Sequence, residues 1–185
     1  LMMGLAFCAT PIVRLILTEK WLPCVPYLQI FCITYMFWPI HTANLNAINA
    51  MGRSDYFLKL EIAKKAIGMI LLLSTMHFGV MVMAYSLLVS TVTSMIINSW
   101  PNKTLLGYSF KEQMVDIFPG IFLALIMGIA ISLIRLLMLP DIVTLAIQIL
   151  VGAAIYIGLS AIFKVESFEY LWNMVKSCLL YTSDA

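Results

Sequence analysis

Charged side chains are scarce in this chain, which has 11 lysines and arginines and nine acidic residues among 185 residues. They make up 11% of the sequence, whereas a soluble domain of this size carries about 25%. Hydrophobic residues account for 63%, and the mean hydropathy is +1.01. So little polar sequence leaves no room for a separate soluble domain and indicates an integral membrane protein.

The sequence also lacks the patterns of several kinds of site. Its cysteines have no pair spacing typical of a metal or redox centre, and most lie in or beside apolar stretches, where a thiol behaves as a small apolar group. These are Cys8, Cys24, Cys32 and Cys178. No phosphate-binding glycine loop or nucleophile elbow occurs, and a net charge of +2 is too small for nucleic acid. We expect no catalytic residue, metal, cofactor or nucleic-acid partner.

What the chain does have is long apolar stretches. A helix needs about 20 mostly apolar residues to cross a hydrocarbon core of about 30 Å. Residues 23–50, 57–76, 80–100, 117–139 and 142–163 reach this length, and residues 1–17 form part of a sixth stretch, which suggests a piece of a longer protein. The stretches are continuous, whereas the strands of a barrel are short and alternate. The sequence therefore predicts an all-α, polytopic bundle of transmembrane helices.

The connections between these stretches give the expected organisation. Residues 1–100 hold four helices, the first incomplete; 101–116 form a polar link, 117–163 a terminal hairpin and 164–185 a tail. Eight of the 11 basic residues lie around the 51–56 loop, in the link or in the tail, and three lie on the other side. Because cytoplasmic segments carry an excess of lysine and arginine, we expect the loop, link and tail to be cytoplasmic.

The tail itself has a different pattern. Its apolar residues recur at helical spacing from Phe168 to Leu179, with Glu166, Glu169, Asn173 and Lys176 between or beside them. This pattern predicts an amphipathic helix along the inner membrane surface, the alternative being a frayed end of the last span. The closing residues 181–185 fit no element, and the end from residue 180 onwards is a candidate for a non-native terminus.

The last two apolar stretches carry small residues where two helices could meet. These are Gly120, Gly128, Ser132, Gly152, Ala153, Gly158 and Ala161. Small side chains let helix backbones approach closely in lipid. Since only Pro140 and Asp141 separate the stretches, we expect a tightly packed hairpin.

The densest polar run inside a predicted span extends from His41 to Asn49. In a helix His41 and Asn44 share one face, and Thr42, Asn46 and Asn49 share the next. A polar arc this wide is costly to expose to lipid, so we expect it to line a cavity, the alternative being hydrogen bonds between helices. An imidazole titrates near neutral pH, which makes His41 a candidate for ion coupling, although a lone histidine is more often structural.

Charged residues inside or near the spans are few. Glu61 and Lys65 are four residues apart, which predicts an ion pair and leaves Lys64 about 100° around the helix without that partner. Lys64 either reaches the headgroups or projects into the cavity as a fixed positive charge. Arg14 and Arg135 lie near the outer ends of their spans and either extend to the headgroups or bind an anionic group.

Several runs of the chain resemble a known family. They include Ala9-Thr10-Pro11-Ile12, Pro26-Tyr27-Leu28-Gln29-Ile30, Ala50-Met51-Gly52-Arg53-Ser54, Leu58-Lys59-Leu60-Glu61 and Lys64-Lys65. In these runs the chain resembles the polysaccharide-transport flippases of the multidrug/oligosaccharidyl-lipid/polysaccharide superfamily. Members of this superfamily show an Ala-x-Gly-Arg loop, a lysine-bearing helix, a glycine turn and a helix rich in small residues. Residues 104–113 look like the family's cytoplasmic link. The resemblance extends to about Lys164, and its motifs are diffuse hydrophobic signatures.

The resemblance implies the C-terminal lobe, with the last six of about 14 spans, of a two-lobed transporter around a V-shaped cavity. Such proteins move undecaprenyl-diphosphate-linked oligosaccharides across the bacterial inner membrane for O-antigen or exopolysaccharide biosynthesis. A polysaccharide polymerase, a chain-length regulator and membrane lipids would then be partners. In this interpretation the substrate-binding candidates are Arg14, His41, Asn44, Asn46 and Lys64.

Three other functions are alternatives to glycan transport. A multidrug or cation exporter of the same superfamily would favour an acidic residue deep in a span, and Glu61 is the nearest. A membrane-embedded glycosyltransferase or polymerase would need a longer polar loop than residues 101–116. A non-transporting scaffold would use each polar group only to hold helices together.

Overall fold

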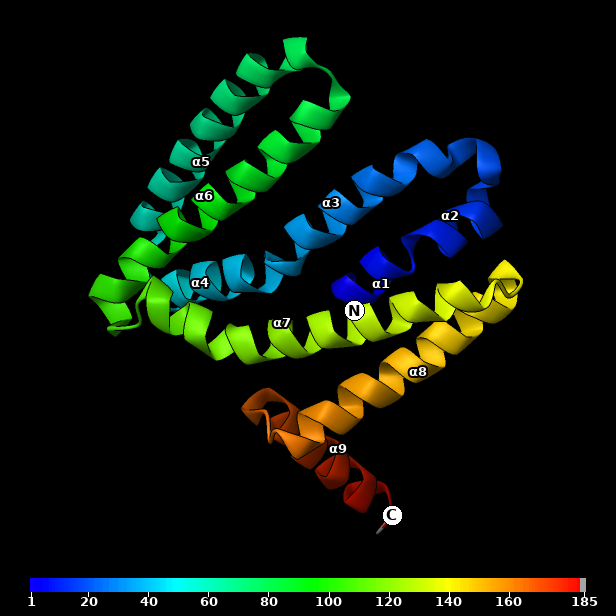
Figure 1. Ribbon diagram of the computed structural model, residues 1–185. Coiled ribbons are helices and arrows are strands. Elements are labelled where there is room, and N and C mark those ends of the chain that lie inside the picture. Colours follow the sequence, from blue (N-terminus) through cyan, green and yellow to red (C-terminus); the bar gives the residue numbers. More distant parts are fainter. Residues whose placement is uncertain (184–185) are drawn as a thin grey trace. The chain divides into compact units, whose positions relative to one another are not determined.

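The computed structural model describes residues 1–183, except for the side chains of Ser167 and residues 178–183. Its elements are all helical and no strand occurs among the described residues, so the all-α prediction is confirmed. The chain divides into two compact units, Leu1–Asp116 and Ile117–Ala185. Figure 1 shows the order of the helices along the chain.

The first unit is built around a long antiparallel pair, α5 (Ser54–Thr75) and α6 (Val80–Leu106), joined by the short 3-10 helix η2 (Met76–Phe78) and Gly79. These two helices lie side by side in Figure 1, and α3 (Val25–Met36) and α4 (Trp38–Ala50) both pack on α6. Two short helices, α1 (Met2–Phe7) and α2 (Ala9–Leu17), pack on α3, with the 3-10 segment η1 (Glu19–Cys24) between α2 and α3.

The first two predicted spans are each broken into two helices. The 23–50 stretch is interrupted at Phe37, and the 1–17 stretch at Cys8. Pro39 and Pro11 account for the breaks, because proline lacks an N–H and its ring clashes with the carbonyl four residues earlier. Helix α3 ends at Met36, one residue after Tyr35, whose carbonyl lies four residues before Pro39. Helix α1 ends at Phe7, whose carbonyl lies four residues before Pro11. The prediction of one continuous span in each stretch was therefore wrong.

The predicted link at 101–116 is also mostly helical. Helix α6 continues through Pro101 to Leu106, and α7 (Phe110–Leu133) begins after only three residues. Gly107 ends α6 with φ of 69°, a left-handed conformation that favours glycine. Ser109 and Glu112 then form a capping box, in which the Ser109 amide donates to Glu112 Oε2 at 2.6 Å and the Glu112 amide to Ser109 Oγ at 3.4 Å.

Three helical segments are long and apolar enough to cross a membrane by length and composition. They are Val80–Leu106, Phe110–Leu137, which includes the 3-10 turn η3 (Ile134–Leu137), and α8 (Asp141–Ile162). Helix α5 has sufficient length, but Lys59, Glu61, Lys64 and Lys65 interrupt its apolar surface. The protein is therefore membrane-associated and helical, with three candidate spans among the described residues.

In the second unit α7 and α8 form the predicted antiparallel hairpin. A Cβ added to Gly152 would lie 3.4 Å from Ile131 Cγ2 and 3.7 Å from Met127 Sδ, which are ordinary contacts, so the two helices meet closely here. One turn earlier on α8, Gln148 Nε2 donates to the Ile131 carbonyl at 3.0 Å. Gly158 has no such neighbour, so the close contact is confined to part of the small-residue surface.

The tail forms the predicted helix, α9 (Glu166–Ser183). The rings of Phe168 and Trp172 stack at 6.2 Å, and Leu171, Trp172 and Val175 are exposed. The helix includes Tyr181, which was expected to fit no element, while Asp184 and Ala185 lie outside the described residues. Its placement on a membrane surface stays a prediction.

Candidate functional site

A cavity of about 330 Å³ lies between α3, α4, α5 and α6, and it is named the polar pocket here. This volume is near the lower end of the range for small-molecule sites, about 300–1,000 Å³. Most of its lining residues carry a hydroxyl, a ring or a charge: Thr34, Tyr35, Trp38, His41, Thr42, Glu61, Lys64, Lys65, Ser90, Thr91 and Ser94. Leu45 and Leu87 complete the lining.

Helical spacing explains why these residues meet. On α4 the lining residues Trp38, His41 and Leu45 follow one another at intervals of three and four, which places them on one face. On α6 the same intervals join Leu87, Ser90 and Ser94. The pocket is thus formed by single faces of neighbouring helices.

The charged side of the pocket differs from the sequence-based prediction. Glu61 pairs with Lys64 rather than Lys65, with 2.5 Å between Lys64 Nζ and Glu61 Oε1. The Lys64 side chain is only 13% exposed, whereas Lys65 is exposed. A buried cation is costly without a nearby carboxylate, so Glu61 pairs with Lys64. Lys65 forms no ion pair within the described part of the chain. Two lysines and one glutamate leave the pocket with a net charge of +1.

Aromatic rings form another side of the pocket. The centroids of Tyr35 and Trp38 are 6.0 Å apart, and those of Trp38 and His41 are 6.4 Å apart. Trp38 is 61% exposed, so its ring surface is open to a ligand. An exposed ring beside hydroxyl groups can pack against the C–H face of a sugar while the hydroxyls bind its polar edge.

His41 connects the pocket to the helix core. It lines the pocket but is only 9% exposed. Its Nδ1 lies 3.1 Å from Asn98 Nδ2. An amide nitrogen can only donate, so Nδ1 is the acceptor and the proton of the neutral ring is assigned to Nε2.

Asn44 belongs to a buried amide network instead of the polar pocket. Its Nδ2 donates to Gln113 Oε1 at 2.8 Å and to Ser99 Oγ at 3.3 Å, and its Oδ1 accepts from Asn102 Nδ2 at 2.5 Å. All four residues are at most 5% exposed. The network connects α4 and α6 to the first turn of α7. Asn44 therefore forms hydrogen bonds between helices, which was the alternative to the predicted cavity lining.

The remaining candidates lie elsewhere. Asn46 is on the exposed face of α4, and Arg14 Nε is 3.6 Å from Glu19 Oε1 near the end of α2. Neither lines the polar pocket, which brings together only His41 and Lys64 of the five predicted substrate-binding residues. The sequence-based prediction missed the hydroxyl groups of α6. Ser90 and Ser94 are four residues apart in a predicted span that also carries Ser86, Thr91 and Thr93, and this concentration of hydroxyls is a signal that could have identified them.

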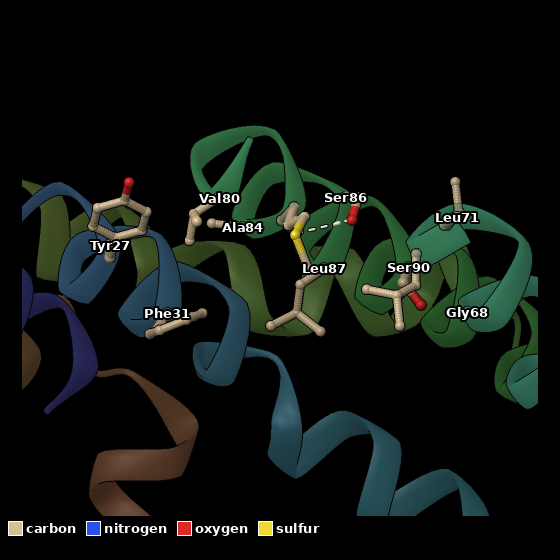
Figure 2. Close-up of a pocket in the computed structure, with 11 residues that line it drawn as sticks. Tyr27, Phe31, Gly68, Leu71, Val80, Ala84, Ser86, Leu87 and Ser90 are labelled. Carbon is tan, nitrogen blue, oxygen red and sulfur yellow. Dashed lines mark hydrogen bonds between the residues drawn. The ribbon is translucent and has the colours of Figure 1, made fainter. Parts of the chain in front are cut away.

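A second cavity, of about 320 Å³, is named the apolar pocket here and is shown in Figure 2. It lies between α3, α5 and α6, and its walls include Tyr27, Phe31, Leu71, Met83 and Ala84. Its Ser86 hydroxyl is satisfied locally, since Ser86 Oγ donates to the Met83 carbonyl at 2.8 Å. Apolar side chains therefore dominate this cavity.

Among the described residues no group of three or more His, Cys, Asp or Glu side chains could hold a metal ion. Cys8, Cys24 and Cys32 are free thiols, while the side chain of Cys178 lies outside the described residues. Comparison with protein-family models, curated proteins and solved structures finds no match for this chain.

Proposed function

We propose that this chain is the C-terminal lobe of a transporter that flips a lipid-linked oligosaccharide across the bacterial inner membrane. The observation that carries the proposal is the polar pocket. In a chain with few charged residues, it combines hydroxyl groups, exposed aromatic rings and a net positive charge within one cavity. These are the groups that a sugar attached to a phosphate would need.

Each part of the pocket has a role in the proposal. The hydroxyls of Thr42, Ser90 and Thr91 and the ring of Trp38 bind the saccharide. Lys64 and Lys65 oppose the diphosphate, and two unit charges at 4 Å attract by about 4 kcal/mol at an effective dielectric constant of 20. His41, at the pocket wall, is the candidate for ion coupling because imidazole titrates near neutral pH.

The proposal places the pocket in a larger assembly. The complete transporter has two lobes and about 14 spans, and it alternates access around a central site. The loop before α5, residues 101–116 and the tail are cytoplasmic, in accordance with their lysines and arginines. The diphosphate lipid is undecaprenyl diphosphate, and a polysaccharide polymerase and a chain-length regulator are the expected partners. The chain is not an enzyme in this proposal.

The cation-exporter alternative is weaker on electrostatic grounds. Glu61 does line the polar pocket, as a cation site would require. However, Lys64 neutralises it, and Lys65 leaves an excess positive charge that repels a cationic substrate. The pocket favours an anion.

The proposal is tested in cells that depend on the complete protein for a surface glycan. We expect Lys64→Ala and Lys65→Gln to lower the glycan while the protein accumulates normally, and Lys64→Arg to retain more export than Lys64→Ala because the cation is kept. Lys59→Gln, an exposed lysine of the same helix outside the pocket, is the control. Parental glycan levels in all variants would contradict the role of the pocket.

A further inference from the structure

The polar and apolar pockets adjoin each other, and together they are named the groove here. Leu87 and Ser90 of α6 line both cavities. Each of three helices also contributes a continuous stripe at helical spacing. From the apolar to the polar end, these stripes are Tyr27, Phe31 and Thr34 on α3, Leu72, Gly68 and Lys64 on α5, and Met83, Leu87, Ser90 and Ser94 on α6.

The groove is long enough for an extended chain with a head group. On α6 it runs from Val80 to Ser94, and the 14 steps between these residues span about 21 Å at the helical rise of 1.5 Å per residue. Its chemistry changes along this length. The end near Val80 is apolar, and the end near Ser94 holds Glu61, Lys64 and Lys65.

We propose that one anionic lipid occupies both pockets, with its chain between α3, α5 and α6 and its phosphate at Lys64 and Lys65. This inference rests on the proposed function and identifies the lipid as the carrier of the transported saccharide. The hydroxyls and the exposed ring of Trp38 favour this occupant over a resident phospholipid, because a simple phosphate head needs the cations but not a sugar-binding wall. A free saccharide would leave the apolar section unused.

Gly68 lies where the two sections meet. A Cβ added there would be 3.5 Å from Ser90 Oγ, an ordinary contact, so alanine fits. A longer side chain at this position has to extend into the space between α5 and α6. Gly68→Leu therefore separates the apolar section from the polar one without changing a charge.

The test uses the complete protein in detergent and farnesyl diphosphate carrying a diazirine at the end of its chain. After illumination, mass spectrometry should find the label on the apolar wall, at Phe31, Leu71 or Met83. Gly68→Leu should reduce labelling by about tenfold or more, since the loss of space for even one methylene in an apolar site is costly. Gly158→Leu, at a glycine with no close neighbour, should leave labelling unchanged.

Two further variants keep the test decisive if Gly68→Leu fails to fold. Leu87→Trp narrows the junction from the opposite helix and should also reduce labelling. Lys65→Gln should weaken it by about two- to fivefold, the effect of one exposed charge pair, whereas Lys59→Gln should not. Labels spread over α7 and α8, or labelling insensitive to the junction variants, would overturn the shared groove.

Competition separates the possible occupants. Excess inorganic diphosphate should compete weakly because it lacks the chain. Equal competition by phosphatidylglycerol and unlabelled farnesyl diphosphate would mean a resident-lipid site and overturn the proposed occupant.

If the groove is not labelled while Lys65→Gln still lowers surface glycan, only this inference fails. If the groove is labelled but the protein exports no glycan, the proposed function fails and the lipid site stands.

Discussion

Asn44 satisfies three hydrogen-bonding partners at once in the buried amide network, and this determines what its replacement should do. Asn44→Leu removes the shorter of two hydrogen bonds from both Gln113 Oε1 and Asn102 Nδ2, and a typical hydrogen bond contributes about 0.5–1.5 kcal/mol. We therefore expect a lower thermal midpoint of the purified protein in detergent. Asn46→Leu, on the exposed face of the same helix, is the matched control and should have little effect. Equal midpoints for the two variants would show that the network does not stabilise the helices.

Tyr108, in the connection between α6 and α7, provides a prediction on pH. Its hydroxyl donates to the Asp116 carboxylate, and this hydrogen bond raises the pKa of Tyr108 from 10.0 to about 12. Since the folded-state pKa is raised, the hydrogen bond stabilises the fold fully below pH 10 and is lost as the pH rises through about 12. The difference in phenolate absorbance between the parent and Tyr108→Phe should therefore titrate near pH 12. A midpoint at the ordinary tyrosine value would contradict the hydrogen bond.

The pairing of Glu61 illustrates what sequence spacing can and cannot determine for single residues. Intervals of three and four both place two residues on one helix face, so Lys64 and Lys65 are each allowed partners. The choice depends on burial, which other helices create. Packing also explains why two asparagines of the same helix differ. Asn44 contacts α6 in the buried network, whereas Asn46 is exposed.

At the scale of helices, hydrophobic length correctly predicted the three candidate spans at 80–100, 117–139 and 142–163, but it did not predict the break in the 23–50 stretch. Proline was an ambiguous signal. Pro39 and Pro11 lie near the starts of α4 and α2, whereas Pro101 and Pro119 lie inside α6 and α7. A proline within a membrane helix is tolerated where neighbouring groups satisfy the freed carbonyl. Around Pro101 the buried Ser99 and Asn102 join other helices, a tertiary effect that the local sequence does not show.

Gly152 tests the packing of the α7–α8 hairpin. Gly152→Leu should lower the thermal midpoint, because its side chain would collide with Ile131 and with Met127, whose Sδ lies 3.7 Å from the position of an added Cβ. Overpacking of this kind typically costs about 1–3 kcal/mol. Gly158→Leu, on the same helix with no neighbour within 4 Å, should have a smaller effect. An unchanged midpoint for Gly152→Leu would mean that the hairpin is not closely packed at this position.

For the whole molecule, orientation is predicted from the basic residues alone. In a variant whose native cysteines are replaced by alanine, a cysteine at Ser54 or Ser109 should be shielded from an impermeant thiol reagent in intact cells. A cysteine at Glu19 should react, because it lies on the opposite side of the membrane in the proposed topology. The reverse pattern would invert the orientation and remove support for the proposed function.

The sequence was sufficient to predict a helical membrane protein, but only part of its candidate site. His41 and Lys64 could be identified because polar groups inside apolar stretches are conspicuous. Tyr35, Trp38 and the hydroxyls of α6 are common in membrane helices and become informative only when packing brings them together. The apolar pocket has no such signal, since its residues look like ordinary membrane-helix residues until α3, α5 and α6 are placed side by side.

Transport of a lipid-linked oligosaccharide is the central proposal, and flipping by the purified complete protein in vesicles tests it most directly. A fluorescent lipid-linked oligosaccharide is incorporated in both leaflets, and an impermeant quencher is added outside. The proposal predicts that the protein progressively exposes the inner-leaflet share to the quencher, and that Lys64→Ala slows this exposure. An inner-leaflet signal that stays protected, as in protein-free vesicles, would contradict the proposal.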